Sequence, residues 1–111
     1  MTPTNLPDLY SRVVAKRPEL AVPHLAYDPV PHWRDTVPRG WCFHGDYAYP
    51  ESDETAAALI LAKWVEALPE HVALERVNDT WWVYHIARER GRRVGPTPLE
   101  ALAAFWLECE A

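Results

Sequence analysis

The fold is decided by residues 71–107, HVALERVNDTWWVYHIARERGRRVGPTPLEALAAFWL. His71 to Val77 and Trp81 to Ala87 are rich in β-branched and aromatic residues and flank a polar Asn78-Asp79-Thr80 turn, which predicts an antiparallel hairpin. Side chains of the second run alternate, and both faces are apolar: one carries Trp82, Tyr84 and Ile86, the other Trp81, Val83 and His85. We therefore expect this second strand to be central in its sheet.

Three helices are predicted around the hairpin. Thr97-Pro98-Leu99-Glu100 is a capping box with proline at the first helical position, and it opens the last helix. Before the hairpin, Ser52 caps a helix whose body, Ala56 to Leu68, is apolar over most of its circumference and is therefore expected to be central. Near the beginning, an i, i+3, i+4 apolar stripe predicts a helix from Leu6 to Arg17, which Pro18 ends.

The remaining segments are expected to be loops and short strands. The chain has 11 prolines, and residues 18–40 are predicted to be a Pro-rich crossing segment that packs on the domain through its large apolar groups. Trp41 to His44 and Tyr47 to Tyr49 are predicted as short strands, and Val94 as the beginning of another. This order predicts a single α+β domain over residues 1–111, with an antiparallel sheet of three to four strands covered by two or three helices.

Composition limits the classes of function. The chain has 111 residues and a net charge of −5, which disfavours binding to nucleic acid and to anionic membranes. No apolar run approaches the roughly 18–20 residues of a membrane span, and the beginning lacks the features of a signal peptide. Cys42 and Cys109 are too few for a disulfide framework, so we expect a cytoplasmic protein.

The second half of the chain resembles a family of phage proteins. A capped Ala-rich helix carrying a Trp (Pro50 to Leu68), a Trp-rich hairpin (Trp81 to Ile86) and a helix opened by Gly-x-Thr-Pro-x-Glu-Ala (Gly95 to Leu102) are similar to small proteins of the phage ABA-sandwich type. The resemblance implies a phage or mobile-element origin, a bacterial host cell and no established chemistry. The last segment also looks like the helix start of HicB-type antitoxins, although in that family a hairpin, not a helix, comes first.

Metal binding and catalysis are not predicted. Cys42, His44 and Asp46 share one face of a predicted strand and are of metal-ligating types. Neighbours on a strand face lie about 6.6–7 Å apart, too far for a nucleophile and its base, and no second ligand pair stands at CxxC or HxxxH spacing. With no phosphate-binding loop or nucleophile elbow either, we expect no metal, no cofactor and no enzyme.

Two groups of residues are candidates for binding a partner. The chain has 6 Trp and 5 Tyr, and exposed rings of this kind anchor interfaces, although burial in the core is the alternative. At the predicted hairpin tip, arginines outnumber Glu89; a solvated loop is the simplest explanation, and contact with phosphate or an acidic protein is the functional one. The predicted partner-binding residues are Trp33, Trp41, Tyr47, Tyr49, Trp81, Arg88, Arg90, Arg92 and Arg93.

We therefore predict a non-enzymatic binding protein of phage or mobile-element type that docks on a protein partner, in its specific form a host defence or nucleic-acid enzyme that it inhibits. The alternative is a protein that binds a nucleotide or another small molecule by stacking it on aromatic rings and holding phosphate with the arginines. Self-association covers aromatic faces as well as a different protein does, so a homodimer is a further possibility.

Overall fold

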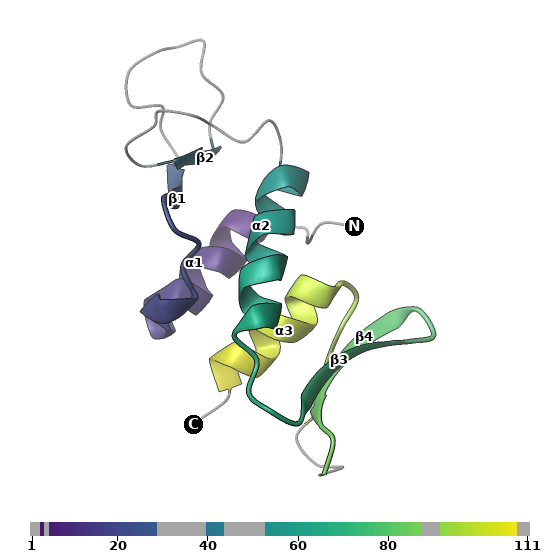
Figure 1. The fold of residues 1–111 in the computed structure, drawn as a ribbon. Coiled ribbons are helices and arrows are strands. Elements are labelled where there is room, and N and C mark those ends of the chain that lie inside the picture. Colours follow the sequence, from purple (N-terminus) through teal and green to yellow (C-terminus); the bar gives the residue numbers. More distant parts are fainter. Residues whose placement is uncertain (1–2, 4, 29–39, 44–52, 88–91, 109–111) are drawn as a thin grey trace.

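The computed structural model describes residues 3, 5–28, 40–43, 53–87 and 92–108 (Figure 1). Its helices are α1 (Leu6–Lys16), α2 (Asp53–Glu66) and α3 (Pro98–Glu108), with a short 3₁₀ turn at Pro18–Leu20. Its strands are β1 (Leu25–Asp28), β2 (Gly40–Phe43), β3 (Val72–Val77), β4 (Thr80–His85) and β5 (Arg93–Gly95). The three helices and the antiparallel sheet packed against α3 confirm the predicted α+β class.

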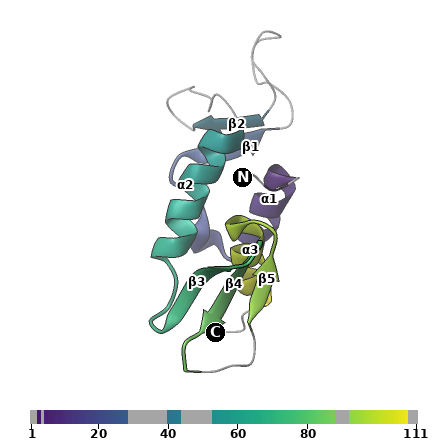
Figure 2. The same cartoon turned by 90° about the vertical axis from the view of Figure 1, so that its right-hand side faces the viewer.

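The main sheet has the order β3-β4-β5, so the strand with two apolar faces is central, as predicted. The register places Leu74 opposite Val83 and Gly95 opposite Trp81. We call the side that carries Val72, Leu74, Trp81 and Val83 the core face. Val83 is fully buried, the other three pack against the core, and α3 lies behind this face in Figure 2.

The predicted capping box begins α3. The hydroxyl oxygen of Thr97 accepts a hydrogen bond from the backbone N–H of Glu100 at 3.2 Å, and Pro98 is the first helical residue. Gly95 is the last residue of β5 and lies close to the backbone of α3. A Cβ at Gly95 would lie 2.6 Å from the backbone nitrogen of Ala101, so only glycine allows the strand and helix to approach this closely.

The first helix and the segment that follows it share a core with α2. Tyr10 stacks on Trp64 with ring centroids 6.4 Å apart, and the indole N–H of Trp64 donates to the carbonyl of Leu20 at 3.1 Å. The hydroxyl of Tyr10 accepts from the N–H of Val22 at 3.1 Å and donates to the carbonyl of Leu25 at 3.3 Å. These bonds tie the described part of the Pro-rich segment to the helices.

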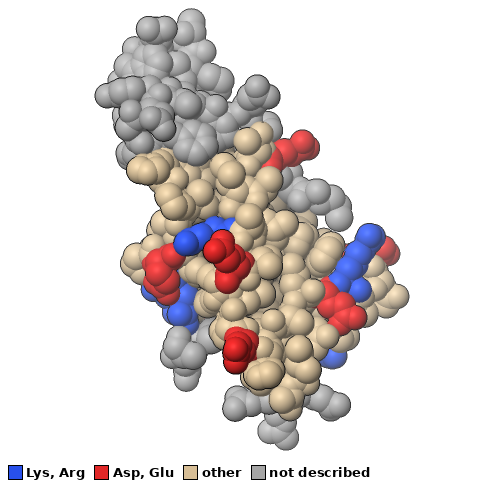
Figure 3. Space-filling view, viewed as in Figure 1, with Lys and Arg blue, Asp and Glu red and all other residues tan. Residues whose placement is uncertain are grey.

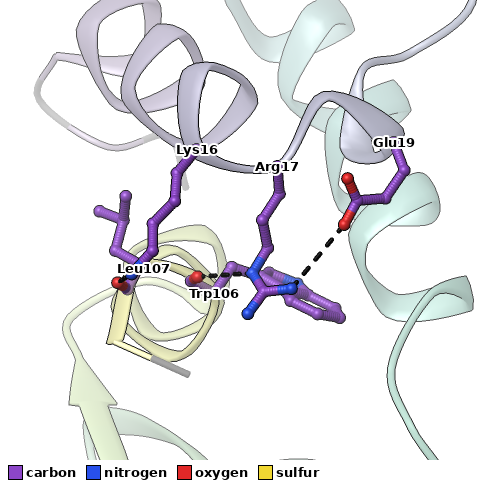
Figure 4. A network of polar contacts seen from close by, with 5 residues as sticks. All are labelled: Lys16, Arg17, Glu19, Trp106 and Leu107. Atoms are coloured by element: carbon purple, nitrogen blue, oxygen red, sulfur yellow. Dashed lines mark hydrogen bonds and ion pairs between the residues drawn. The ribbon is translucent and has the colours of Figure 1, made fainter. Parts of the chain in front are cut away.

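Basic residues at the end of α1 hold the end of α3 (Figure 4). Arg17 donates from Nε to the carbonyl of Trp106 at 2.9 Å, and Lys16 donates to the carbonyl of Leu107. The guanidinium of Arg17 also lies over the Trp106 ring, 5.4 Å from its centroid, and 3.8 Å from the carboxylate of Glu19. These contacts satisfy carbonyls that the last turn of α3 leaves without helical partners.

Two expectations differ from the structure. The strand predicted at Trp41 to His44 forms as β2 but pairs with β1, which was expected to be loop, in a separate two-stranded ribbon. The helix α2, expected to be central because it is apolar over most of its circumference, is buried on one side only. It buries one side, with Ile60 and Trp64, while its other side exposes Leu59 and Val65, because α2 forms an outer layer of the domain.

Candidate functional site

The side of the main sheet that turns away from α3 carries an aromatic surface without a covering element in the described part of the chain. The register places Trp82 between Glu75 on β3 and Val94 on β5. Because side chains alternate between the two sides of a strand, Tyr84 and Ile86 follow Trp82 on the same side. Val94 is 48% exposed and Ile86 64%, whereas Trp82 and Tyr84 are half-buried. In Figure 2 this side points toward the viewer, and no described element lies in front of it.

We call this surface the open face; it consists of Glu75, Trp82, Tyr84, Ile86, Arg92 and Val94. Two polar contacts organise it. The guanidinium of Arg92 lies over the Trp82 ring, 4.3 Å from its centroid. The hydroxyl of Tyr84 donates to the carboxylate of Glu75 at 2.7 Å, and this hydrogen bond is the largest cause of a raised Tyr84 pKa, followed by desolvation and the Glu75 charge.

The two predicted partner-binding aromatic residues that the structure describes, Trp41 and Trp81, do not lie on the open face. Trp41, on β2, is 3% exposed and meets the rings of Tyr10 and Tyr27 edge-on at 5.1 and 5.5 Å. Trp81 is on the core face and packs against the core. Trp33, Tyr47 and Tyr49 lie outside the described residues. The neighbouring Trp82 and Tyr84, which the prediction did not select, are the rings on the open face.

The sequence contained a signal for this choice. Trp81 shares its face with Val83, and the opposite strand contributes Val72 and Leu74 to the same face. The other face of that strand contributes Glu75, which a core would not accept without an ionic partner. Arg76 lies on the core face, opposite Trp81, so the pair of large apolar residues Val72 and Leu74, and not charge alone, distinguishes the two faces of β4.

The predicted arginine cluster is divided between the two faces. Arg92 lies on the open face, over Trp82, whereas Arg93 lies on the core face and forms an ion pair with Glu108 of α3. Arg88 and Arg90 lie outside the described residues. Because the two described guanidinium groups point to different neighbours, they do not form one phosphate-binding cluster.

A groove lies between α1, α3 and β5, and Val94 of the open face is one of the residues that line it. This groove has a volume of about 600 Å³, and its apolar lining includes Leu9 and Leu107. The charged lining residues are Asp8, Arg12, Glu100 and Glu108. Asp8 and Arg12 are 3.9 Å apart and both exposed, so the groove presents three carboxylates against one guanidinium.

Metal ligands do not gather within residues 3, 5–28, 40–43, 53–87 and 92–108: no group of three or more His, Cys, Asp or Glu side chains could hold an ion there. The backbone of Cys42 belongs to β2, while His44 and Asp46 lie outside the described residues. Among the helices of the described chain, none is long and apolar enough to cross a bilayer. On the side drawn in Figure 3, the described basic side chains form no extended patch.

Comparison with known proteins identifies no relative of this chain. No protein-family model, curated protein sequence or solved structure matches the chain.

Proposed function

We propose that this chain is a protein-binding domain that docks a protein partner on the open face of its main sheet. The observation that carries the proposal is that the half-buried rings of Trp82 and Tyr84 lie beside the exposed Val94 and Ile86 on a side of the sheet that no described element covers. Interfaces are enriched in Trp, Tyr and Arg, and a central aromatic ring with polar groups at the rim is the usual arrangement of their energetically dominant residues. The open face has this arrangement, with Trp82 central and Glu75 and Arg92 at its sides.

Binding of a nucleotide is the second candidate, since Trp82 and Arg92 are a ring and a guanidinium side by side. Three features make nucleotide binding a weaker candidate than protein docking. Arg92 already covers a side of the ring, in a contact that stabilises by about 0.5–1 kcal/mol at an exposed site. The carboxylate of Glu75, bonded to Tyr84, would repel a phosphate. The groove between α1 and α3 is lined by three carboxylates and would repel it too.

A finer assignment follows from the resemblance of the second half of the chain to small phage proteins. A small acidic domain that docks through an aromatic surface is suited to a phage or mobile-element inhibitor of a host defence or nucleic-acid enzyme. This part of the proposal rests on the resemblance, whereas docking on the open face rests on the surface itself.

Site-specific photo-cross-linking tests the docking role. A benzoylphenylalanine placed at Tyr84 keeps an aromatic ring on the open face, and the same residue at Tyr27, on β1, is the matched control because that side chain is also partly exposed. In the native cells of this protein, we expect Tyr84 to give a protein–protein adduct and Tyr27 to give none. Adducts only from Tyr27, or none from Tyr84, would contradict the proposal.

A further inference from the structure

Building on the docking role proposed for the open face, we propose that its occupant is a protein segment that presents one aspartate or glutamate among apolar side chains, and that this carboxylate binds the guanidinium of Arg92. The observation behind this is the place of that guanidinium. The backbone of Arg92 lies just before β5, but the guanidinium lies over the ring of Trp82 on the central strand, 4.3 Å from the ring centroid.

The surroundings of Arg92 differ from those of three other described arginines. Arg12, Arg17 and Arg93 each form an ion pair with a carboxylate of the chain. Within the described residues, no carboxylate pairs with Arg92, which is exposed and in contact with the Trp82 ring. An aromatic ring attracts the positive charge but does not accept a conventional hydrogen bond, so the N–H donors of this guanidinium are left to the solvent.

Docking makes this arrangement unfavourable unless the partner supplies a counter-charge. A partner that covers the central Trp82 ring also covers the guanidinium that lies over it. A charge that is taken out of water without an opposite charge or hydrogen bonds destabilises the complex. A carboxylate suits a guanidinium because it accepts two parallel hydrogen bonds and neutralises the charge. The ring also holds the guanidinium in place before docking, which lowers the entropy cost of ordering it.

The carboxylate that belongs to the open face is engaged elsewhere. Glu75 lies on β3, at the edge of the sheet, and accepts a hydrogen bond from the hydroxyl of Tyr84 at 2.7 Å. Because Glu75 is exposed at this edge, it can keep its water when a partner covers the centre of the face. The guanidinium over the central ring cannot, so the counter-charge for Arg92 has to come from the partner.

The charges nearby restrict the partner to an isolated acidic residue. The chain carries a net charge of −5, and Glu75 lies directly opposite Trp82, so a run of acidic residues or a phosphate with its additional charge is repelled. Ile86 and Val94, which are 64% and 48% exposed, offer apolar contacts on the same face. One carboxylate flanked by apolar side chains meets both conditions.

Cross-linking in the native cells of this protein tests the role of Arg92. Benzoylphenylalanine at Ile86 reports on the open face and leaves Trp82 and the bond between Tyr84 and Glu75 unchanged. In this background, we expect Arg92→Glu to lower the yield of the protein adduct about tenfold or more, because it sets a carboxylate against the carboxylate of the partner. Arg92→Gln removes the charge without reversing it and is expected to lower the yield less; it carries the test if Arg92→Glu does not fold.

Arg76→Glu is the matched control. It changes the net charge by the same amount at an exposed arginine, but Arg76 lies opposite Trp81, on the core face. We expect Arg76→Glu and Glu75→Gln to keep the adduct yield within about twofold, because exposed charges outside the contact are largely screened. Circular dichroism shows whether each variant is folded. Equal losses for Arg92→Glu and Arg76→Glu would overturn the proposal, and so would an equal loss for Glu75→Gln, which would make Glu75 the counter-charge.

Mass spectrometry of the adduct identifies the segment of the partner, and a charge exchange then tests its carboxylate. Changing the acidic residue of that segment to lysine is expected to restore the adduct with Arg92→Glu. A segment without aspartate or glutamate, or an exchange that restores nothing, would exclude the carboxylate.

The carboxylate and the docking role fail in different ways. An adduct whose yield does not depend on Arg92 leaves docking on the open face intact and excludes only the carboxylate. If benzoylphenylalanine gives no adduct at Tyr84 or at Ile86, docking itself is contradicted, and the carboxylate falls with it.

Discussion

The two faces of the main sheet are built from the same kinds of residue and have different surroundings. The core face sets Trp81 and Val83 against α3, and the open face sets Trp82 and Tyr84 where no described element covers them. Composition and alternation are almost the same on both sides of β4, so they do not determine which face is buried. What differs is the neighbouring strand β3, which contributes Val72, Leu74 and Arg76 to the core face and only Ala73 and Glu75 opposite Tyr84 and Trp82 on the open face.

A matched pair of valines gives the largest expected contrast. Val83 is fully buried on the core face, and Val94 is half-exposed on the next strand. Val83→Glu replaces a fully buried apolar side chain with a carboxylate, and because its desolvation costs several kcal/mol even with Arg93 opposite, we expect it to lower the free energy of unfolding by about 3–5 kcal/mol. Val94→Glu is expected to cost about 1 kcal/mol or less, the range of strand propensity on an exposed surface.

Urea denaturation at a low protein concentration measures both variants without a contribution from association. Similar losses for Val83→Glu and Val94→Glu would mean that the open face is covered in solution even in the monomer. In that case the core face and the open face would not differ in burial.

The second contrast concerns added volume. Gly95 faces α3 so closely that a methyl group would lie 2.6 Å from the backbone of Ala101. We expect Gly95→Ala to lower the free energy of unfolding by about 1–3 kcal/mol, as overpacking does in other cores. Ala73 lies opposite Tyr84, on the same side of the sheet as the open face, and Ala73→Val also adds carbon; its effect is expected to be within about 0.5 kcal/mol because no described element covers that side. Equal denaturation midpoints for Gly95→Ala and the wild type would show that β5 and α3 can move apart freely.

The elements that the sequence predicts best are those with local signals. The cap at Thr97, the proline that follows it and the turn at Asn78-Asp79 act over a few residues, and α3 and the β3–β4 hairpin form close to where they are predicted, with Thr80 already in β4. The central position of β4 was also predictable, because a strand with two apolar faces belongs inside a sheet.

The rest depends on contacts between distant parts of the chain. The strand β1 forms because Leu25–Asp28 finds β2, about fifteen residues away, and four residues with a nearby proline carry too weak a pattern to predict that pairing. One side of α2 is exposed because no other described element packs against it. The local sequence of a helix does not show whether another element will cover it. Alternation places Trp81 and Trp82 on opposite faces of β4 but does not say which face is covered, so alternation alone could not favour Trp82 over Trp81.

The smallest expected effect is a change in a tyrosine pKa. Tyr10 and Tyr84 both have raised pKa values, but for different reasons. Burial is the main cause at Tyr10, opposed by the hydrogen bond from Val22, whereas the hydrogen bond to Glu75 is the main cause at Tyr84. We expect Glu75→Gln to lower the pKa of Tyr84 and to leave that of Tyr10 raised, in a titration followed by NMR of the tyrosine rings. A Tyr84 pKa that does not move would mean that its hydroxyl is not held by Glu75.

The sign of the linked stability follows from these directions. A tyrosine whose pKa is higher in the folded state than its ordinary value of about 10 contributes stability that is complete below that value and is lost as the pH rises through the folded-state pKa. Both tyrosines therefore weaken the fold in alkali. Because the hydrogen bond to Glu75 is the largest cause of the raised pKa of Tyr84, Glu75→Gln should reduce its part and leave the part of Tyr10, which comes mainly from burial.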